Sequence, residues 1–268
     1  MTFRRVYQSM GRQEIQESQY RIPYHYLPWE RDGIWRVGRF LGWGFEYLAV
    51  LDTVLELVEK SLQQGQRQTK VLDFGCGDGR LIVELLTRYP YLAIVVGVDI
   101  SERALAFAKA ATWADQRVEF FLDVVTAIQR IGHFDVVIAM EVLEHIPPEN
   151  LPEIITQLHN ALTEDGWLIV SVPTTNIPLN RKHYQHFTLQ TLTQILSNRF
   201  SLQDVHYVHR IGVFSEWIRR AVINRFFVCN SETWLKLCTW LYNRFVRVAD
   251  ERTGAHMICR FRKAGHDR

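Results

Sequence analysis

The stretch from Val71 to Gly79, V-L-D-F-G-C-G-D-G, constrains the fold of this chain more than any other. It begins as a short apolar run with Asp73 near its end, and glycines then occupy alternate positions. An apolar pattern of helical spacing follows at once, so the stretch predicts a strand, a tight turn and a helix. Because glycine has no Cβ, the turn can adopt positive φ, and a ligand can lie against bare backbone at the strand tip and helix N-terminus.

A second strand strengthens this prediction. The run A-I-V-V-G-V, residues 93–98, ends at Asp99, which follows Gly79 by twenty residues. An acidic residue at the tip of the second strand is placed to accept hydrogen bonds from both hydroxyls of a ribose. A nicotinamide-binding domain is the alternative, but its G-x-G-x-x-G fingerprint would put the third glycine one residue later than Gly79.

Apolar runs of strand length continue to alternate with helical patterns along the rest of the chain, which predicts a doubly wound α/β sheet. The seven predicted strands are residues 70–74, 93–98, 118–122, 134–139, 167–172, 202–210 and 256–261. With 47% hydrophobic residues among 268, the chain can bury a full α/β core and still carry additions at each end.

Four motifs occur in order between about residues 50 and 200: D-F-G-C-G-D-G, V-D-I-S, L-D-V and F-D-V-V-I-A-M-E-V-L-E-H-I. In these the chain resembles the class I S-adenosylmethionine-dependent methyltransferases of the type 11 and type 23 branch. The resemblance implies a Rossmann-like seven-stranded sheet of order 3-2-1-4-5-7-6, with the cofactor at the carboxyl ends of the first two strands. It also implies that S-adenosylmethionine is bound and S-adenosylhomocysteine is released.

The resemblance further implies which residues contact the cofactor. Carboxylates at strand tips suit a ligand that carries a cationic sulfonium and a ribose with two hydroxyls, and Asp73, Asp99 and Asp123 hold such positions. Helix capping is the alternative role for these three. Glu141, at the end of the fourth strand, is expected beside the methyl donor. The full set of implied cofactor residues is Asp73, Gly75, Cys76, Gly77, Asp99, Ile100, Asp123, Val124 and Glu141.

Three histidines are the candidate catalytic residues. A hydroxyl acceptor must lose its proton, and a positioned histidine can supply about 10² to 10⁴-fold as a general base. His183 and His186 lie in K-H-Y-Q-H-F-T, which resembles the H-x-x-H-F-T of small-molecule members of the family, and His145 lies in E-V-L-E-H-I. The alternative is that these histidines only anchor their loop by hydrogen bonds.

A metal site is the main competing hypothesis. Glu141, Glu144 and His145 would share one face if their segment were helical, and a further histidine could complete a site for a divalent metal. The small-RNA terminal 2′-O-methyltransferases use a similar pattern. The segment F-T-L-Q-T-L after His186 lacks the further aromatic pattern of those enzymes, and we therefore expect no metal.

Additions flank and interrupt the predicted sheet. Residues 1–45 are rich in aromatics, Pro and Gly and predict an arm that packs on the core or covers the cofactor, before a methyltransferase domain at 46–268. Residues 210–250 predict a helical hairpin inserted before the last strand, and between residues 210 and 248 seven basic residues stand against Glu216 and Glu232. These are Arg210, Arg219, Arg220, Arg225, Lys236, Arg244 and Arg247. The hairpin could form a wall of the acceptor pocket or contact an anionic membrane.

Taken together, these patterns predict a methyltransferase acting on an oxygen, or less readily a nitrogen, of a small-molecule or saccharide-like acceptor. The rivals are a metal-dependent small-RNA 2′-O-methyltransferase and a non-catalytic cofactor-binding subunit. The net charge of +2 does not indicate a nucleic-acid partner. No apolar run is long enough for a membrane span and the four cysteines form no C-x-x-C motif, which favours a cytoplasmic, at most membrane-peripheral, protein. Oligomeric state stays open.

Overall fold

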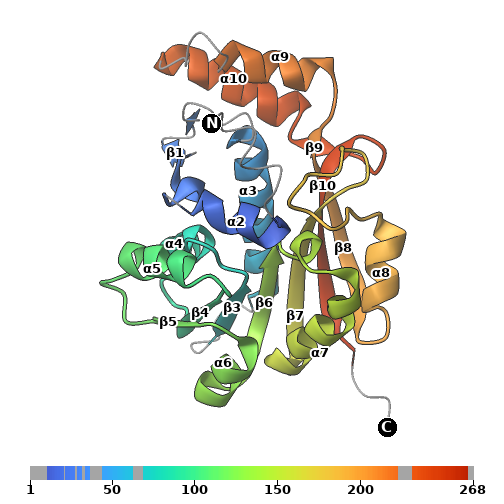
Figure 1. Ribbon diagram of the computed structural model, residues 1–268. Coiled ribbons are helices and arrows are strands. Elements are labelled where there is room, and N and C mark those ends of the chain that lie inside the picture. Colours follow the sequence, from blue (N-terminus) through green and yellow to red (C-terminus); the bar gives the residue numbers. More distant parts are fainter. Residues whose placement is uncertain are drawn as a thin grey trace.

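One mixed sheet of eight strands, in the order β5-β4-β3-β6-β7-β10-β8-β9, forms the centre of the molecule (Figure 1). The computed structural model describes residues 11–20, 22–27, 29–31, 34–36, 44–62, 69–222 and 231–264. The strands of the sheet are β3 (Lys70–Phe74), β4 (Ile94–Val98), β5 (Val118–Phe121), β6 (Phe134–Met140), β7 (Leu162–Pro173), β8 (Phe200–Arg210), β9 (Val248–Ala249) and β10 (Gly254–Lys263).

The order of the strands confirms the predicted topology. Strands β5, β4, β3, β6 and β7 are parallel, and β10 lies antiparallel between β7 and β8. The last predicted strand thus enters the sheet between the fifth and the sixth. The short β9 adds an eighth strand at the edge beside β8. Strand β7 begins at Leu162 rather than after the turn E-D-G at residues 164–166, so the predicted start at Trp167 is wrong.

Helices cover both faces of the sheet, as the alternation of side chains along each strand requires. Val71 and Val136 point into one apolar core, and their neighbours Leu72 and Val137 point into the other. Burying a side chain of this size contributes about 1.5 to 3 kcal/mol. The first core is covered by α3 (Gly44–Ser61), α4 (Arg80–Arg88) and α5 (Glu102–Ala111), and the second by α6 (Val124–Ile131), α7 (Leu151–Ala161) and α8 (Leu189–Leu196). Helix α3 ends before Gly65, the predicted stop, which lies outside the described residues.

The N-terminal arm crosses the carboxyl ends of the parallel strands. It consists of α2 (Arg12–Gln19), the 3₁₀ turn η1 (Tyr24–Tyr26) and a small hairpin of β1 (Trp29–Arg31) and β2 (Ile34–Arg36). Figure 1 shows α2 lying over the tips of the central strands. Arg12 Nε donates to the carbonyl of His183 at 3.0 Å, and Glu17 forms an ion pair with Arg103 at 3.7 Å. The arm is therefore attached at both sides of this edge of the sheet.

The predicted helical hairpin lies between β8 and β10. Its helices are α9 (Val213–Val222) and α10 (Glu232–Phe245), and Arg225 between them lies outside the described residues. The inner face of α10 packs on α3, where the ring of Tyr242 stacks on Phe45 at 5.0 Å. Among the described residues, no helix combines the length and apolarity that crossing a bilayer requires.

Candidate active site

A cavity of about 970 Å³ opens at the carboxyl ends of the parallel strands, beneath the arm. This volume is near the upper end of the range of about 300 to 1,000 Å³ for small-ligand sites, which leaves room for two small molecules together. Most of the predicted site residues line it. These are Asp73, Gly75, Cys76, Asp99, Ile100, Asp123, Val124, Glu141, His145, His183 and His186.

The glycine turn brings backbone, rather than side chains, to one end of the cavity. Gly75 has a φ of 75°, and its N–H donates to the carbonyl of Val98 at 2.7 Å. A Cβ on Gly75 would lie 2.4 Å from Val142 Cγ2, which requires glycine at this position. Gly77 is placed differently from our expectation: it lies outside the cavity wall formed by the described residues, and its N–H donates to Asp99 Oδ2 at 2.9 Å.

Two carboxylates face the cavity beside this turn. Asp73 is 2% exposed, and its Oδ2 has no hydrogen-bond partner among the described residues. Burial and the nearby Asp99 raise the pKa of Asp73 to about 8. Burial also raises the pKa of Asp99, although its bonds from the N–H groups of Ser101 and Gly77 oppose the shift. Asp73 and Asp99 together suit a ligand that brings positive charge and hydroxyl donors.

The next strand tip carries a capping residue. Asp123 is the N-cap of α6, where Oδ1 accepts from the N–H of Thr126 at 2.7 Å and Oδ2 accepts from its hydroxyl at 2.8 Å. The capping role considered for Asp123 therefore occurs, and the carboxylate still lines the cavity. Ile100 is 72% exposed and Val124 is buried, so this part of the wall offers apolar surface to a flat ring.

His183 and His186 form a hydrogen-bonded pair at the other end of the cavity. His186 Nδ1 lies 3.2 Å from the carbonyl of Ile177, which can only accept, so Nδ1 carries the proton. His186 Nε2 then accepts from His183 Nδ1 at 2.8 Å. His183 Nε2 is left with a free lone pair. Burial, with His145 and Lys182 nearby, lowers the pKa of His183 to about 2, so the imidazole is neutral at physiological pH.

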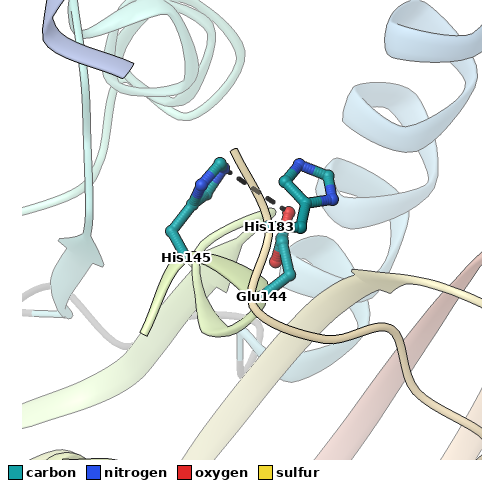
Figure 2. Close-up of side chains that lie close together, drawn as sticks. All are labelled: Glu144, His145 and His183. Atoms are coloured by element: carbon teal, nitrogen blue, oxygen red, sulfur yellow. Dashed lines mark ion pairs between the residues drawn. The ribbon is translucent and has the colours of Figure 1, made fainter. Parts of the chain in front are cut away.

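The side chains of His145 and Glu144 also lie close to His183. Glu144 and His145 belong to the 3₁₀ turn η2 (Leu143–His145), and their side chains point toward His183 in Figure 2. One ligand atom from each of the three lies within 4.8 Å of the others. His145 Nδ1 is 3.2 Å from the carbonyl of Lys182, and its Nε2 lies 3.9 Å from Glu144 Oε1. Glu144 is 1% exposed, and burial raises its pKa well above the usual range.

These three residues could hold a divalent metal ion, although we expected no metal from the sequence. Metal-bound histidines usually donate their second ring N–H to a carbonyl, as His145 does here. The helical face that we considered for Glu141, Glu144 and His145 does not form. Glu141 has a φ of 56°, so the chain turns before η2 and sends its carboxylate elsewhere.

Glu141 instead belongs to a buried charge network that we did not anticipate. Its Oε1 accepts from the hydroxyl of Ser171 at 2.9 Å, and its Oε2 lies 2.8 Å from His256 Nδ1. His256 Nε2 lies 2.5 Å from Glu46 Oε1 on α3, 210 residues away in the sequence. The signal available in the sequence was weak: a glutamate in the first turn of a helix that carries other charged residues, and a histidine near the start of a buried strand.

Comparison with known proteins decides the family. A family model described as a methyltransferase domain matches residues 43–207, which is more than half of the chain. The chain belongs to this methyltransferase family. Its sheet is the Rossmann-like sheet of the S-adenosylmethionine-dependent methyltransferases.

Curated relatives of the methyltransferase match only part of their own length. A Geobacillus sp. (strain WCH70) protein named as a methyltransferase is 35% identical over 132 residues, which cover 47% of this chain and 52% of the relative. The ubiquinone biosynthesis O-methyltransferase of Bartonella quintana is 36% identical over 104 residues, covering 38% of this chain and 40% of the relative. The chain thus spans about half or less of the length of these relatives.

Solved structures extend the likeness to nearly the whole methyltransferase. Magnesium protoporphyrin IX methyltransferase from Synechocystis PCC 6803, with bound S-adenosylmethionine, aligns with a TM-score of 0.57 at 18% identity, over 96% of this chain and 99% of that one. The N-methyltransferase NodS from Bradyrhizobium japonicum WM9, with S-adenosylhomocysteine, aligns with a TM-score of 0.51 at 15% identity, over 79% and 86%. At these identities the likeness establishes the shared fold.

Two structural observations indicate that the cavity residues of the methyltransferase fit its cofactor. The buried Oδ2 of Asp73 has no partner among the described residues, and a cationic ligand would satisfy it. Gly75 itself lines the cavity, so a ligand can approach the backbone of the turn. The arm encloses this end. Tyr20 and Tyr24 line the cavity, and His25 Nδ1 lies 2.9 Å from Asp78 Oδ1.

Proposed function

We propose that this methyltransferase transfers the methyl group of S-adenosylmethionine to a hydroxyl oxygen of a small-molecule acceptor. One observation carries the proposal: a neutral, hydrogen-bonded histidine pair lines the same cavity as the glycine turn and Asp73. The lone pair on His183 Nε2 can accept the proton that a hydroxyl must lose. The named O-methyltransferases among the relatives support an oxygen acceptor. Alcohols, phenols and saccharides share the required hydroxyl, and a nitrogen acceptor is the less favoured choice.

In this proposal each end of the cavity has a separate task. S-adenosylmethionine, when bound, supplies a methyl group on a cationic sulfur. Asp73 and the backbone at Gly75 hold its methionine end, and Asp99 accepts from the ribose hydroxyls. Ile100 and Val124 flank the adenine. His183 holds the acceptor hydroxyl and takes its proton, while His186 fixes the tautomer of His183. Enclosure by the arm excludes water and keeps the two reactants aligned, an effect worth up to about 7 to 11 kcal/mol.

A second candidate chemistry is metal-assisted transfer, favoured by the convergence of Glu144, His145 and His183. A divalent metal there would bind the acceptor oxygen and lower its pKa, which would replace the general base. The buried carboxyl of Glu144 would then be ionised, because the metal charge offsets the cost of burial. The two candidates use the same residues for different tasks and are separated by one assay.

The assay measures S-adenosylhomocysteine formed with a panel of alcohols, phenols and saccharides, in the presence and absence of a chelator. We expect turnover with hydroxyl acceptors, no turnover with their O-methylated counterparts, and an unchanged rate after chelation. A loss of at least tenfold on chelation, restored by Mg²⁺ or Zn²⁺, would favour the metal-assisted candidate. Tight cofactor binding without turnover on any acceptor would contradict both and indicate a non-catalytic cofactor-binding subunit.

We also propose that the outer face of the hairpin contacts an anionic membrane. Rings from both helices join there: Phe214 stacks on Trp217 at 6.0 Å and contacts Phe245 at 5.7 Å, and Phe245 contacts Trp240 at 6.2 Å. All four are at least 42% exposed. Arg244 lies over the ring of Phe245 at 5.3 Å, so the face combines interfacial aromatics with positive charge. Arg220 on α9 is paired with Glu216 at 2.6 Å.

Sedimentation with vesicles containing phosphatidylglycerol tests this contact. We expect the protein to bind at low salt and to be released as salt rises, because screening weakens the attraction. Replacing Trp217 and Trp240 with Ala should weaken binding about tenfold, or about 1.4 kcal/mol. The matched control is Trp113→Ala, since Trp113 is 85% exposed but lies beyond α5. Equal loss in the control, or no sedimentation at low salt, would remove the membrane from the proposal.

A further inference from the structure

His256 is held between two carboxylates in the wall of the cavity. Its Nε2 lies 2.5 Å from Glu46 Oε1, and its Nδ1 lies 2.8 Å from Glu141 Oε2 without the alignment of a hydrogen bond. The three side chains come from the start of β10, from α3 and from the end of β6, and all three line the cavity. With a carboxylate at each ring nitrogen, the imidazole is poorly placed to accept a proton from a substrate.

The protonation state of each residue in this network depends on its partners in the network. Burial alone would lower the pKa of His256, but Glu141 and Glu46 outweigh it and raise the pKa well above the usual range. Burial likewise opposes ionisation of Glu141, yet His256 and Ser171 lower its pKa. Among the described residues, the other titratable groups that face the network are His209 from β8, Tyr242 from α10, Glu144 and His145 from η2, and Lys182, His183 and His186 from the loop after β7. Both histidines of that loop have lowered pKa values, and burial raises that of Glu144.

Glu141 lies where the two ends of the cavity meet. Its N–H donates to the carbonyl of Ser171 at 3.0 Å, and the next residue, Val142, packs against the glycine turn at Gly75. A φ of 56° is strained for a non-glycine residue, and such conformations persist where neighbours hold them. Ser171 and His256 are the neighbours that hold this side chain.

We propose that His256 is a positioning residue that keeps the carboxylate of Glu141 ionised and directed toward the sulfonium of S-adenosylmethionine. This inference rests on the proposed placement of the cofactor's methionine end beside Glu141. It gives a role to a histidine outside the family motifs quoted above, at the far end of the chain. Glu46 then acts as a second anchor for His256 rather than as a ligand.

The pH dependence of cofactor affinity follows from the charges. In the native protein His256 stays protonated through neutral pH and Glu141 stays ionised, so this pair adds no pH dependence to the affinity for S-adenosylmethionine between pH 6 and 8.5. Asp73, whose pKa is raised to about 8, adds the same pH dependence to the native protein and to the variants. In His256→Gln, Glu141 loses its nearest cation and remains close to Glu46, with Lys182 as the other cation near it, so its pKa rises. Its carboxylate then becomes protonated as the pH falls, and the affinity of the variant relative to the native protein should decline toward pH 6. S-adenosylhomocysteine carries no sulfonium charge, so its affinity should change little.

Calorimetry of both ligands with four folded variants, each checked by circular dichroism, tests the inference. We expect His256→Gln and Glu141→Gln each to weaken S-adenosylmethionine about tenfold at pH 6, and the double variant to lose no more than either alone. Glu46→Gln, the matched control, keeps the His256 and Glu141 pair and should lose less than about threefold.

The outcomes distinguish a failure of the role proposed for His256 from a failure of the proposed cofactor placement beside Glu141. If Glu141→Gln leaves the affinity for S-adenosylmethionine unchanged, the cofactor does not contact Glu141 and the proposed placement fails. If Glu141→Gln weakens binding but His256→Gln does not, or if His256→Gln weakens both ligands equally at every pH, the placement stands and His256 has no positioning role.

Discussion

Gly75→Val should abolish detectable binding of S-adenosylmethionine. Gly75 has a φ of 75°, where a β-branched residue costs on the order of 1 to 3 kcal/mol. A Cβ would lie 2.4 Å and 2.9 Å from the two methyl groups of Val142, so Val142 or the turn must move. Either movement closes the approach to the backbone and displaces Glu141. Calorimetry on the folded variant should detect no binding at ligand concentrations 100 times the native dissociation constant.

Gly132→Val separates the effect of the site from that of backbone strain. Gly132 also has positive φ, at 90°, but the nearest atom to its Cβ position, Lys70 Nζ, is 3.6 Å away, an ordinary contact distance. Gly132 lies at the end of α6 and is not among the residues that line the cavity. This variant should lose a comparable amount of stability and keep its cofactor. Native affinity in folded Gly75→Val would mean that the turn shapes the fold without receiving the ligand.

His183→Gln should reduce kcat for methyl transfer by about 10² to 10⁴-fold, because the hydroxyl proton loses its acceptor. Cofactor affinity should stay within about twofold, since His183 lies at the opposite end of the cavity from Asp73. The native pH profile provides a second check. An imidazole with the ordinary pKa near 6.5 would lose half its base at that pH. Because the pKa of His183 is lowered to about 2, the native rate should hold its plateau down to about pH 5.5.

His159→Gln is the matched control for this change. His159 is also a buried histidine, and burial lowers its pKa. It lies on α7 and packs against Phe200 of β8, outside the cavity wall formed by the described residues. Its replacement should leave kcat unchanged. An equal fall in both variants would assign the effect to packing, and an unchanged kcat in His183→Gln would leave His183 as a loop anchor only.

The cofactor end of this site could be predicted from local patterns. Buried strands that alternate with helices make a parallel sheet, and a parallel sheet gathers the carboxyl ends of its strands at one edge. Residues that directly follow those strands, such as Gly75, Asp99 and Glu141, must therefore meet. The turn glycines could also be predicted from the sequence, because the need for positive φ is a property of a few consecutive residues.

The remaining features of the site depend on contacts that no local pattern encodes. His256 and Glu46 are 210 residues apart and meet only because β10 enters the sheet beside β7, where α3 packs. Tyr20 covers Gly77 because the arm folds back over the strand tips, and this placed Gly77 outside the cavity contrary to expectation. The positive φ of Glu141 turns one carboxylate toward His256 and leaves Glu144 with His145 and His183.

By itself, then, the sequence determined the sheet, the position of the cofactor edge and the conformation of its glycine turn. These follow from periodicity and from backbone freedom, which act between near neighbours. Tertiary structure alone decided the partners of each buried charge. Such a charge must find its counter-charge across packed elements, because an unpaired ion in a dry interior costs several kcal/mol.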